Sequence, residues 1–302
     1  MDACALFIPT RSPMWQPLLR NWLLGQAQQR MREAAAQAAN QAADDAKSAE
    51  EQGPGEDAPR PVCHVGLVFA LSIEAGALVD KLSGAIGTHG ADFVAREGGL
   101  GGRRLVLVES GVGRERAARA TEALIAGHQP RWVISAGFAG GLDNRLKQGD
   151  MLLADTIVDT QNRELSLDLG LGEPGPRVHV GRLLTVDKVI RDPEQKRALG
   201  QRHNALAVDM ETMGVAEACQ REKVRFLSVR VIIDEVDRTL RRDSDVLVNK
   251  ESTAGRLGAA AGAIFRRPSS VKDMWQLKED ALVASDRLAK FLAGVVGQLP
   301  KV

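Results

Sequence analysis

From residue 62 onward, short apolar runs alternate with polar or glycine-rich stretches. Helix-like segments begin near Glu74, Arg114 and Met213, between these runs. Runs that are apolar throughout are typical of strands buried on both faces of a parallel sheet, so the alternation predicts a mostly parallel α/β sheet. The expected strands are Val62–Leu71, Arg104–Glu109, Trp132–Ser135, Met151–Val158, Gly181–Ile190 and Phe226–Ile233.

The two ends of the chain have patterns of their own. Residues 1–60 begin with Trp and Leu on one helical face, become rich in Ala and Gln, and end in the linker-like stretch GPGEDAPRP. We expect a helical extension with a flexible linker over 1–60 and one α/β domain over 61–302. The extension could pack on its own domain, be loosely ordered, or dock on a partner or membrane surface. A closing helix from Val271 should lie on the sheet through Met274, Leu277, Ala281, Leu282 and Leu288.

Composition narrows the class of protein. The 302 residues are 44% hydrophobic and carry a net charge of +1, which gives no electrostatic reason to expect nucleic-acid binding. Cys4, Cys63 and Cys219 have no metal-ligand spacing, so a reduced cytoplasm fits best. No apolar run approaches the roughly 20 residues of a membrane span. No pattern suggests a metal or organic cofactor, and Arg116 stands where a dinucleotide fingerprint needs its third glycine.

Acids and glycines gather where strands should end and helices begin. Glu74, Ser110 and Gly137 each follow an expected strand, and Glu211 and Asp234 bracket a helix and the strand after it. A helix that opens at the carboxyl edge of a sheet crosses back, so the next parallel strand ends at that same edge. We therefore expect these residues in one crevice, where carboxylates can perform acid–base chemistry. Taken singly, each acid could equally cap a helix or begin a turn.

Five segments, between about Val62 and Asp237, match a known family in content and order. They are VGLVFALSIEAGALVDKL, ESGVG, SAGFAGGL followed by QGD, AVDMETMGVAEACQ and VRVIIDEVD. In them the chain resembles the nucleoside phosphorylase superfamily, most closely the methylthioadenosine/S-adenosylhomocysteine nucleosidases. The resemblance implies a three-layer α/β/α fold with a mostly parallel, mixed central sheet. It also implies a small-molecule nucleoside substrate and a homo-oligomer, most simply a dimer.

The resemblance also implies roles for individual residues. Glu74 matches the glutamate that activates the attacking water, and Asp234 the aspartate that protonates the purine at N7 as the base departs. Burial should let Asp234 keep its proton near neutral pH. Glu211 matches the glutamate that binds the ribose hydroxyls, and Met210 the methionine under the sugar. The other expected binding residues are Val189 and Ile190 beside the base, Ser110 and Gly111 beside the sugar, and Ala70, Gly137 and Asp209.

Some positions depart from the family pattern and leave the substrate open. Ile233 replaces a serine before the catalytic aspartate, Val189 replaces a stacking aromatic residue, and Phe138 replaces a serine. Ser135 and Phe138 stand where hexameric phosphorylases place a phosphate-binding arginine and serine, which favours water as the nucleophile. Arg114 and Arg116 could still bind phosphate from another direction.

Three functions remain open. The first is hydrolysis of a 5′-modified adenosine, as in methylthioadenosine or S-adenosylhomocysteine salvage, with release of adenine. The second is a phosphorylase or hydrolase of another nucleoside, of the purine nucleoside, adenosylhopane or futalosine type. The third is a nucleoside-binding protein without catalysis. The presence of Glu74, Glu211 and Asp234 together argues against the third, because a pure binder does not need all three acids.

Overall fold

The computed structural model describes residues 63–90, 93–167, 175–237 and 268–300. The predicted extension and linker over residues 1–60 lie outside the described residues, and so do the side chains of Met274 and Leu277. Of the helices that the structure describes, none combines the length and apolar character of a membrane-spanning segment.

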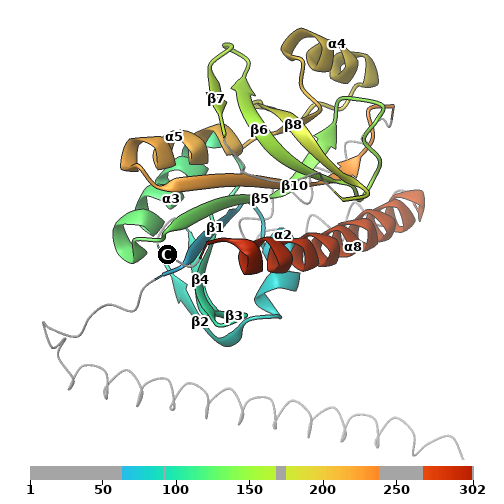
Figure 1. The fold of residues 1–302 in the computed structure, drawn as a ribbon. Helices are drawn as coiled ribbons and strands as arrows, with labels where there is room; N and C mark the ends of the chain where they lie inside the picture. The colour runs from blue at the N-terminus through green and yellow to red at the C-terminus, as the bar shows by residue number, and fades with distance from the viewer. Residues whose placement is uncertain (1–62, 91–92, 168–174, 238–267, 301–302) are drawn as a thin grey trace, which may run out of the picture. The chain divides into compact units, whose positions relative to one another are not determined.

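The described strands form one mixed sheet. They are β1 (Val65–Phe69), β2 (Ser83–His89), β3 (Val94–Leu100), β4 (Arg103–Glu109), β5 (Trp132–Gly141), β6 (Met151–Asp159), β7 (Glu164–Ser166), β8 (Val178–Thr185), β9 (Ala207–Asp209) and β10 (Arg225–Asp234). Their order is β10-β6-β8-β9-β5-β1-β4-β3-β2, with β7 paired to β6 (Figure 1). At the centre, β4, β1, β5 and β10 pair in parallel, whereas the β2–β3 hairpin and the β6–β10 pair are antiparallel. The predicted α/β class with a mixed sheet is confirmed.

Strand β5 connects the two parts of this sheet. Its first residues pair with β1, its last residues, Gly140 and Gly141, pair with β9, and β10 runs along most of its length. Because β10 also pairs with β6, β6 with β8, and β8 with β9, these five strands close into a ring. The glycines allow a close approach: a β-carbon on Gly141 would lie 3.2 Å from the carbonyl oxygen of Asp234. The end of β10 is thereby held against the end of β5.

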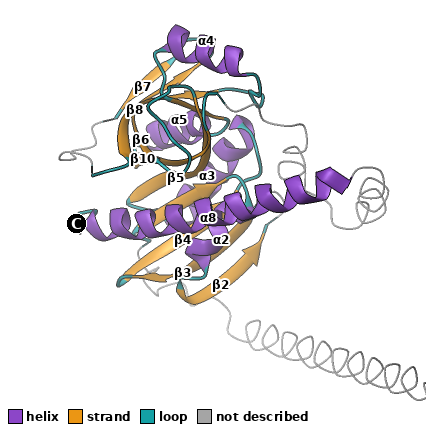
Figure 2. Cartoon of the chain, turned by 90° about the vertical axis from the view of Figure 1, so that its right-hand side faces the viewer, coloured by secondary structure: helices purple, strands orange, loops and turns teal. Residues whose placement is uncertain are grey.

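Helices cover both faces of the sheet. Alternation along β1 assigns its side chains to two separate cores: Leu67 and Phe69 pack in the cluster that includes α2 and α8, and Val68 packs in the cluster that includes α3 and α5. Figure 2 shows α8 lying across the strands beside α2. The three-layer α/β/α arrangement is therefore confirmed. The described helices are α2 (Ser72–Val79), α3 (Arg114–His128), α4 (Pro193–His203), α5 (Thr212–Glu222) and α8 (Pro268–Gln298).

The closing helix α8 lies on the sheet as expected, but with one difference in its apolar face. Ala281 and Leu288 are buried, whereas Leu282 is 52% exposed. Residues 281 and 288 are seven positions apart and share a helical face, while position 282 is turned away from it by one residue. The prediction that Leu282 faces the sheet was wrong.

Several elements differ from the sequence-based expectation. The strand expected over Gly181–Ile190 ends at Thr185, and the residues after it form a loop. Strand β5 extends to Gly141, so Gly137 lies inside a strand and does not follow one. The glycine-rich segment before Arg104, expected as a loop, forms the β2–β3 hairpin, and α4 was not predicted. The hairpin escaped prediction because every residue of β2 is exposed and gives no buried apolar pattern.

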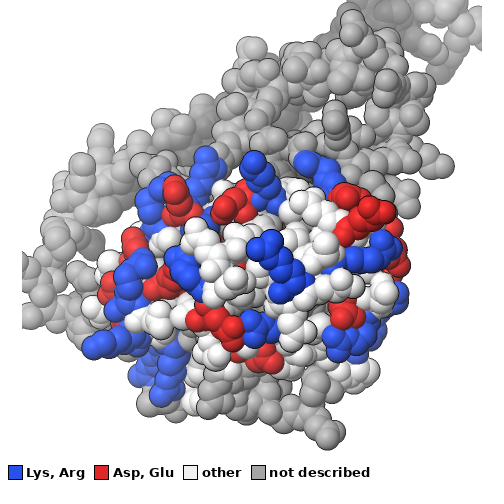
Figure 3. All heavy atoms as spheres, turned by 90° about the horizontal axis from the view of Figure 1, so that it is seen from above, with Lys and Arg blue, Asp and Glu red and all other residues white. Residues whose placement is uncertain are grey.

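Charges of both signs are mixed on the described surface. Figure 3 shows Lys and Arg side chains interspersed with Asp and Glu on the face seen from above. Ion pairs such as Arg221–Glu122 and Arg182–Glu164 link neighbouring elements of the described domain. Among the described residues of the face in Figure 3, the basic side chains therefore form no continuous stripe of the kind that follows a nucleic-acid backbone.

Candidate active site

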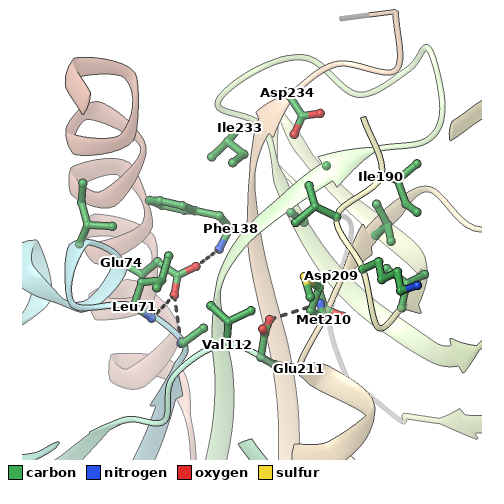
Figure 4. Close-up of a pocket in the computed structure, with 18 residues that line it drawn as sticks. Leu71, Glu74, Val112, Phe138, Ile190, Asp209, Met210, Glu211, Ile233 and Asp234 are labelled. Atoms are coloured by element: carbon green, nitrogen blue, oxygen red, sulfur yellow. Dashed lines mark hydrogen bonds between the residues drawn. The ribbon is translucent and has the colours of Figure 1, made fainter. Parts of the chain in front are cut away.

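A cavity opens at the sheet edge where β1 and β10 end (Figure 4). Eight of the predicted site residues line it, and they come from four separate parts of the chain that the topology brings together. They are Ala70, Glu74, Val189, Ile190, Asp209, Met210, Glu211 and Asp234. The rest of its lining is mostly apolar: Leu71, Ile73, Val112, Phe138, Ala139, Gly140, Val186, Lys188, Val208 and Ile233.

Glu74 lies in the first turn of α2 and is held by backbone donors. Its Oε2 accepts hydrogen bonds from the N–H groups of Ala70 at 3.0 Å and Leu71 at 2.9 Å. Its Oε1 accepts one from the N–H of Phe138 on β5 at 2.8 Å. A side chain that reaches back to the first residue of its own helix is a common way to satisfy the free N–H groups there. Burial nevertheless raises the pKa of Glu74, because loss of water outweighs these bonds.

Glu211 stands across the cavity from Glu74, immediately before α5 (Figure 4). Its Oε1 accepts a hydrogen bond from the N–H of Gly113 at 2.9 Å, and its Oε2 one from Met210 at 3.3 Å. Burial raises the pKa of Glu211 to about 8, and the carboxylates of Asp209 and Glu74 add to the rise. Mutual repulsion among acids in a partly apolar cavity is a recurrent property of catalytic sites.

Asp209 lines the cavity but is bound on its inner side. Its carboxylate accepts two hydrogen bonds from Arg230, at 3.0 Å and 2.7 Å, and one from the hydroxyl of Thr185 at 2.8 Å. Arg230 is 2% exposed and also donates to Ser135 and Thr212, at 2.7 and 2.6 Å. This buried network gives Asp209 a structural role that its position in the sequence motif did not reveal.

Asp234 ends β10 at the opposite side of the cavity, at the top of Figure 4. Its carboxylate is 3% exposed and contacts the ammonium group of Lys196 on α4. A β-carbon on Gly140 would lie 3.2 Å from Oδ1 of Asp234, so the glycine gives this acid its place beside β5. Sequence reasoning missed Lys196. The available signal was the helix itself, because Asp192 caps its start before Pro193 and Asn204 closes it in a left-handed conformation.

The residues that depart from the family pattern meet in the cavity. Figure 4 shows the Phe138 ring and Ile233 next to one another on the wall between Glu74 and Asp234. Val189 and Ile190, in the loop after β8, also line the cavity, and Figure 4 shows Ile190 on the side away from Phe138, with Met210 below it. The result is an apolar chamber with carboxylates at its two ends, which suits an organic ligand with polar edges.

Ser110, Gly111 and Gly137 are not among the lining residues. The Ser110 hydroxyl is buried and donates to backbone carbonyls, that of Phe69 at 3.2 Å and that of Gly111 at 2.9 Å. Gly111 adopts a φ of 76°, where glycine is favoured, and so allows the turn before α3. Gly137 lies against the Glu74 carboxylate and leaves room for it. These residues shape the cavity from outside it.

A mixed α/β sheet whose strand ends carry carboxylates around an apolar cavity defines a protein built to bind and polarise a small organic molecule. The family can be named more closely: the chain belongs to the phosphorylase superfamily, whose family model matches residues 64–170 and 166–267. The matched region spans most of the described domain and contains all of the cavity acids. The resemblance of the five sequence segments is thereby confirmed.

Individual relatives are nucleosidases. A 5′-methylthioadenosine/S-adenosylhomocysteine nucleosidase from Exiguobacterium sp. is 28% identical over 199 residues, 57% of this chain and 85% of that protein. The enzyme of the same name from S. pneumoniae, solved with a transition-state inhibitor, has a TM-score of 0.61 at 19% identity, over 78% of this chain and 100% of that one. A futalosine hydrolase mutant from Helicobacter pylori has a TM-score of 0.60 at 17% identity, over 79% and 100% of the two chains. At such identities the structural likeness shows the fold alone.

Proposed function

We propose that this protein is an N-ribosyl hydrolase that releases adenine from a 5′-modified adenosine of the methylthioadenosine or S-adenosylhomocysteine type. The observation that carries the proposal is the placement of Glu74, Glu211 and Asp234 around one apolar cavity. The nucleosidase relatives support the choice of reaction and substrate class.

The three acids suit the charges of the reaction. Breaking an N-glycosidic bond builds positive charge on the ribose and negative charge on the base. In our proposal Glu74 takes the proton of the attacking water, for which a raised pKa brings its proton affinity closer to neutral pH. Glu211 holds the ribose hydroxyls, and Asp234 lies where a leaving base can share a proton. The apolar walls exclude water from the other faces of the ligand and strengthen these interactions.

The partners of Arg230 and Arg114 favour water over phosphate as the nucleophile. Arg230 commits its donors to Asp209, Ser135 and Thr212. Arg114, which could have bound phosphate, pairs with Asp159 at 3.0 Å and Glu217 at 2.6 Å. An incoming phosphate would have to break these charge-assisted bonds before it gained its own.

The experiment is adenine release from methylthioadenosine, measured with and without phosphate. Release without phosphate supports the hydrolase. Strict dependence on phosphate would instead assign a phosphorylase, and binding without release a non-catalytic protein. Asp234→Asn should lower the rate sharply, and an unchanged rate would remove Asp234 from the mechanism.

A dimer and a reduced, cytoplasmic setting belong to the same proposal. The family resemblance supports the dimer. Cys63 and Cys219 are free, buried thiols, and burial raises their pKa values to about 11 and about 12, so neither is a ready thiolate. Both are therefore suited to packing in the core and not to catalysis.

A further inference from the structure

Behind Asp234 lies a lysine that the proposed reaction does not yet use. The Lys196 side chain is completely buried, with 0% exposure, and Asp234 beside it is 3% exposed. Its ammonium group contacts Oδ2 of Asp234 and donates to the carbonyl oxygen of Glu235 at 3.1 Å. Asp234 lines the cavity and Lys196 does not, so the lysine reaches the acid from its far side.

A buried ammonium is costly unless it is paired, and lysine is among the residues least often buried completely. Two charged residues close to Lys196 and Asp234 in the sequence form ion pairs with other residues. Glu235 pairs with Lys147 at 3.1 Å through its side chain, and Arg197 on α4 pairs with Asp237. The remaining charges that face the cavity are those of Lys188, Asp209, Glu74 and Glu211. Within the described part of the chain, Lys196 contacts the Asp234 carboxylate with its ammonium group.

A contacting cation favours the ionised form of a carboxylate, which opposes the effect of burial. The sequence predicts that burial lets Asp234 keep its proton, but it does not reveal this neighbouring cation. We propose that Lys196 is a positioning residue that holds the Asp234 carboxylate ionised and oriented in the empty cavity, so that the protein takes up a proton from solution when a purine base binds. The proton lies between Asp234 and the base in the complex. The inference rests on the proposed function for the identity of the base.

The test is to measure the binding of adenine to the whole protein by titration calorimetry near neutral pH. The titration is repeated in buffers of different ionisation enthalpy. The slope of the heats gives the number of protons taken up. Wild type should take up a proton, Lys196→Arg should behave like wild type because it keeps the cation, and Lys196→Met should take up about one proton fewer because Asp234 is then already protonated. A purely structural lysine would change affinity without changing this number.

Equal proton uptake by Lys196→Met and wild type would overturn the inference. If Lys196→Met does not fold, the wild type and Lys196→Arg still test the inference. The adenine affinity of both should fall by up to about tenfold per pH unit as pH rises above neutrality. An affinity that stays constant with pH, or binding without proton uptake, overturns the role of Lys196. Turnover is not needed for these readings. Failure of the wild-type protein to bind adenine at all would overturn the proposed function together with this inference.

Discussion

The carboxylate of Glu74 occupies the space beside Gly137. A β-carbon on Gly137 would lie 2.7 Å from Oε1 of Glu74, closer than real β-carbons come to another atom. The same oxygen accepts the hydrogen bond from the next residue, Phe138, at 2.8 Å. Strand β5 therefore leaves room for the acid and also fixes its orientation. This glycine of the SAGFAGGL segment therefore accommodates a side chain of the protein itself.

Gly137→Ala should displace the Glu74 carboxylate and lower kcat for nucleoside cleavage by about tenfold or more, since a misplacement of about 1 Å can cost about a hundredfold. Steady-state kinetics would show the loss. The matched control is Gly127→Ala in α3, where an added β-carbon meets nothing within 4 Å. Activity of Gly137→Ala equal to that of the control would contradict the proposed packing.

Glu74→Gln should remove the base that activates water and lower kcat by roughly a hundredfold to ten-thousandfold, the usual contribution of general acid–base catalysis. Adenine binding should persist. Glu109→Gln is the control: Glu109 ends β4, pairs with Arg96 and Ser72, and does not line the cavity. If Glu74→Gln turned over as fast as Glu109→Gln, another residue would have to activate the water.

The free energy of unfolding of the ligand-free protein should fall as pH rises, because of the raised pKa of Glu211. Its pKa is about 8 in the folded protein against an ordinary value of 4.5. Between these two pH values the folded state holds a proton that the unfolded state has released, so the free energy of unfolding falls as pH rises through this window. The window runs from roughly pH 5 to roughly pH 8. Within it, the Tm of Glu211→Gln should depend less steeply on pH than the Tm of the wild type. Parallel curves for the two proteins would refute the assignment.

Arg230→Met should destabilise the fold by about 3–5 kcal/mol, because removal of one partner leaves Asp209 buried without its charge partner. Denaturant unfolding gives the value. Lys290→Met is the control, since its ion pair with Asp286 joins side chains that are 67% and 49% exposed, where water screens the attraction and the pair adds little stability. A similar cost for both substitutions would mean that the buried network does not stabilise the fold as proposed.

The sequence was informative wherever burial is strong. Strand β1 and the end of β10 are apolar runs, and their boundaries placed Glu74 and Asp234 at one edge. Strand β5 was predicted too short, because Ala and Gly after Ser135 are typical of turns in isolation. In the fold Gly137 lies against Glu74 and Gly140 against Asp234, where an added β-carbon would be crowded.

What the sequence could not predict are the partners of buried charges. Lys196 lies on a helix and Arg230 in a buried strand, and the local sequence around each gives no sign of its partner, which is 38 and 21 positions away. Only the ring closure of β5, β10, β6, β8 and β9 and the packing of α4 bring them together. The acids of the cavity could therefore be predicted from the sequence, whereas the cations that surround them could be identified only in the structure.

In the proposed reaction water, activated beside Glu74, attacks the sugar, and this step can be measured directly. Its most direct test is turnover of methylthioadenosine in water enriched in heavy oxygen, with phosphate also present, followed by mass spectrometry of the sugar product. Hydrolysis predicts free methylthioribose that carries the heavy atom at its anomeric hydroxyl. A sugar phosphate without heavy oxygen would contradict it.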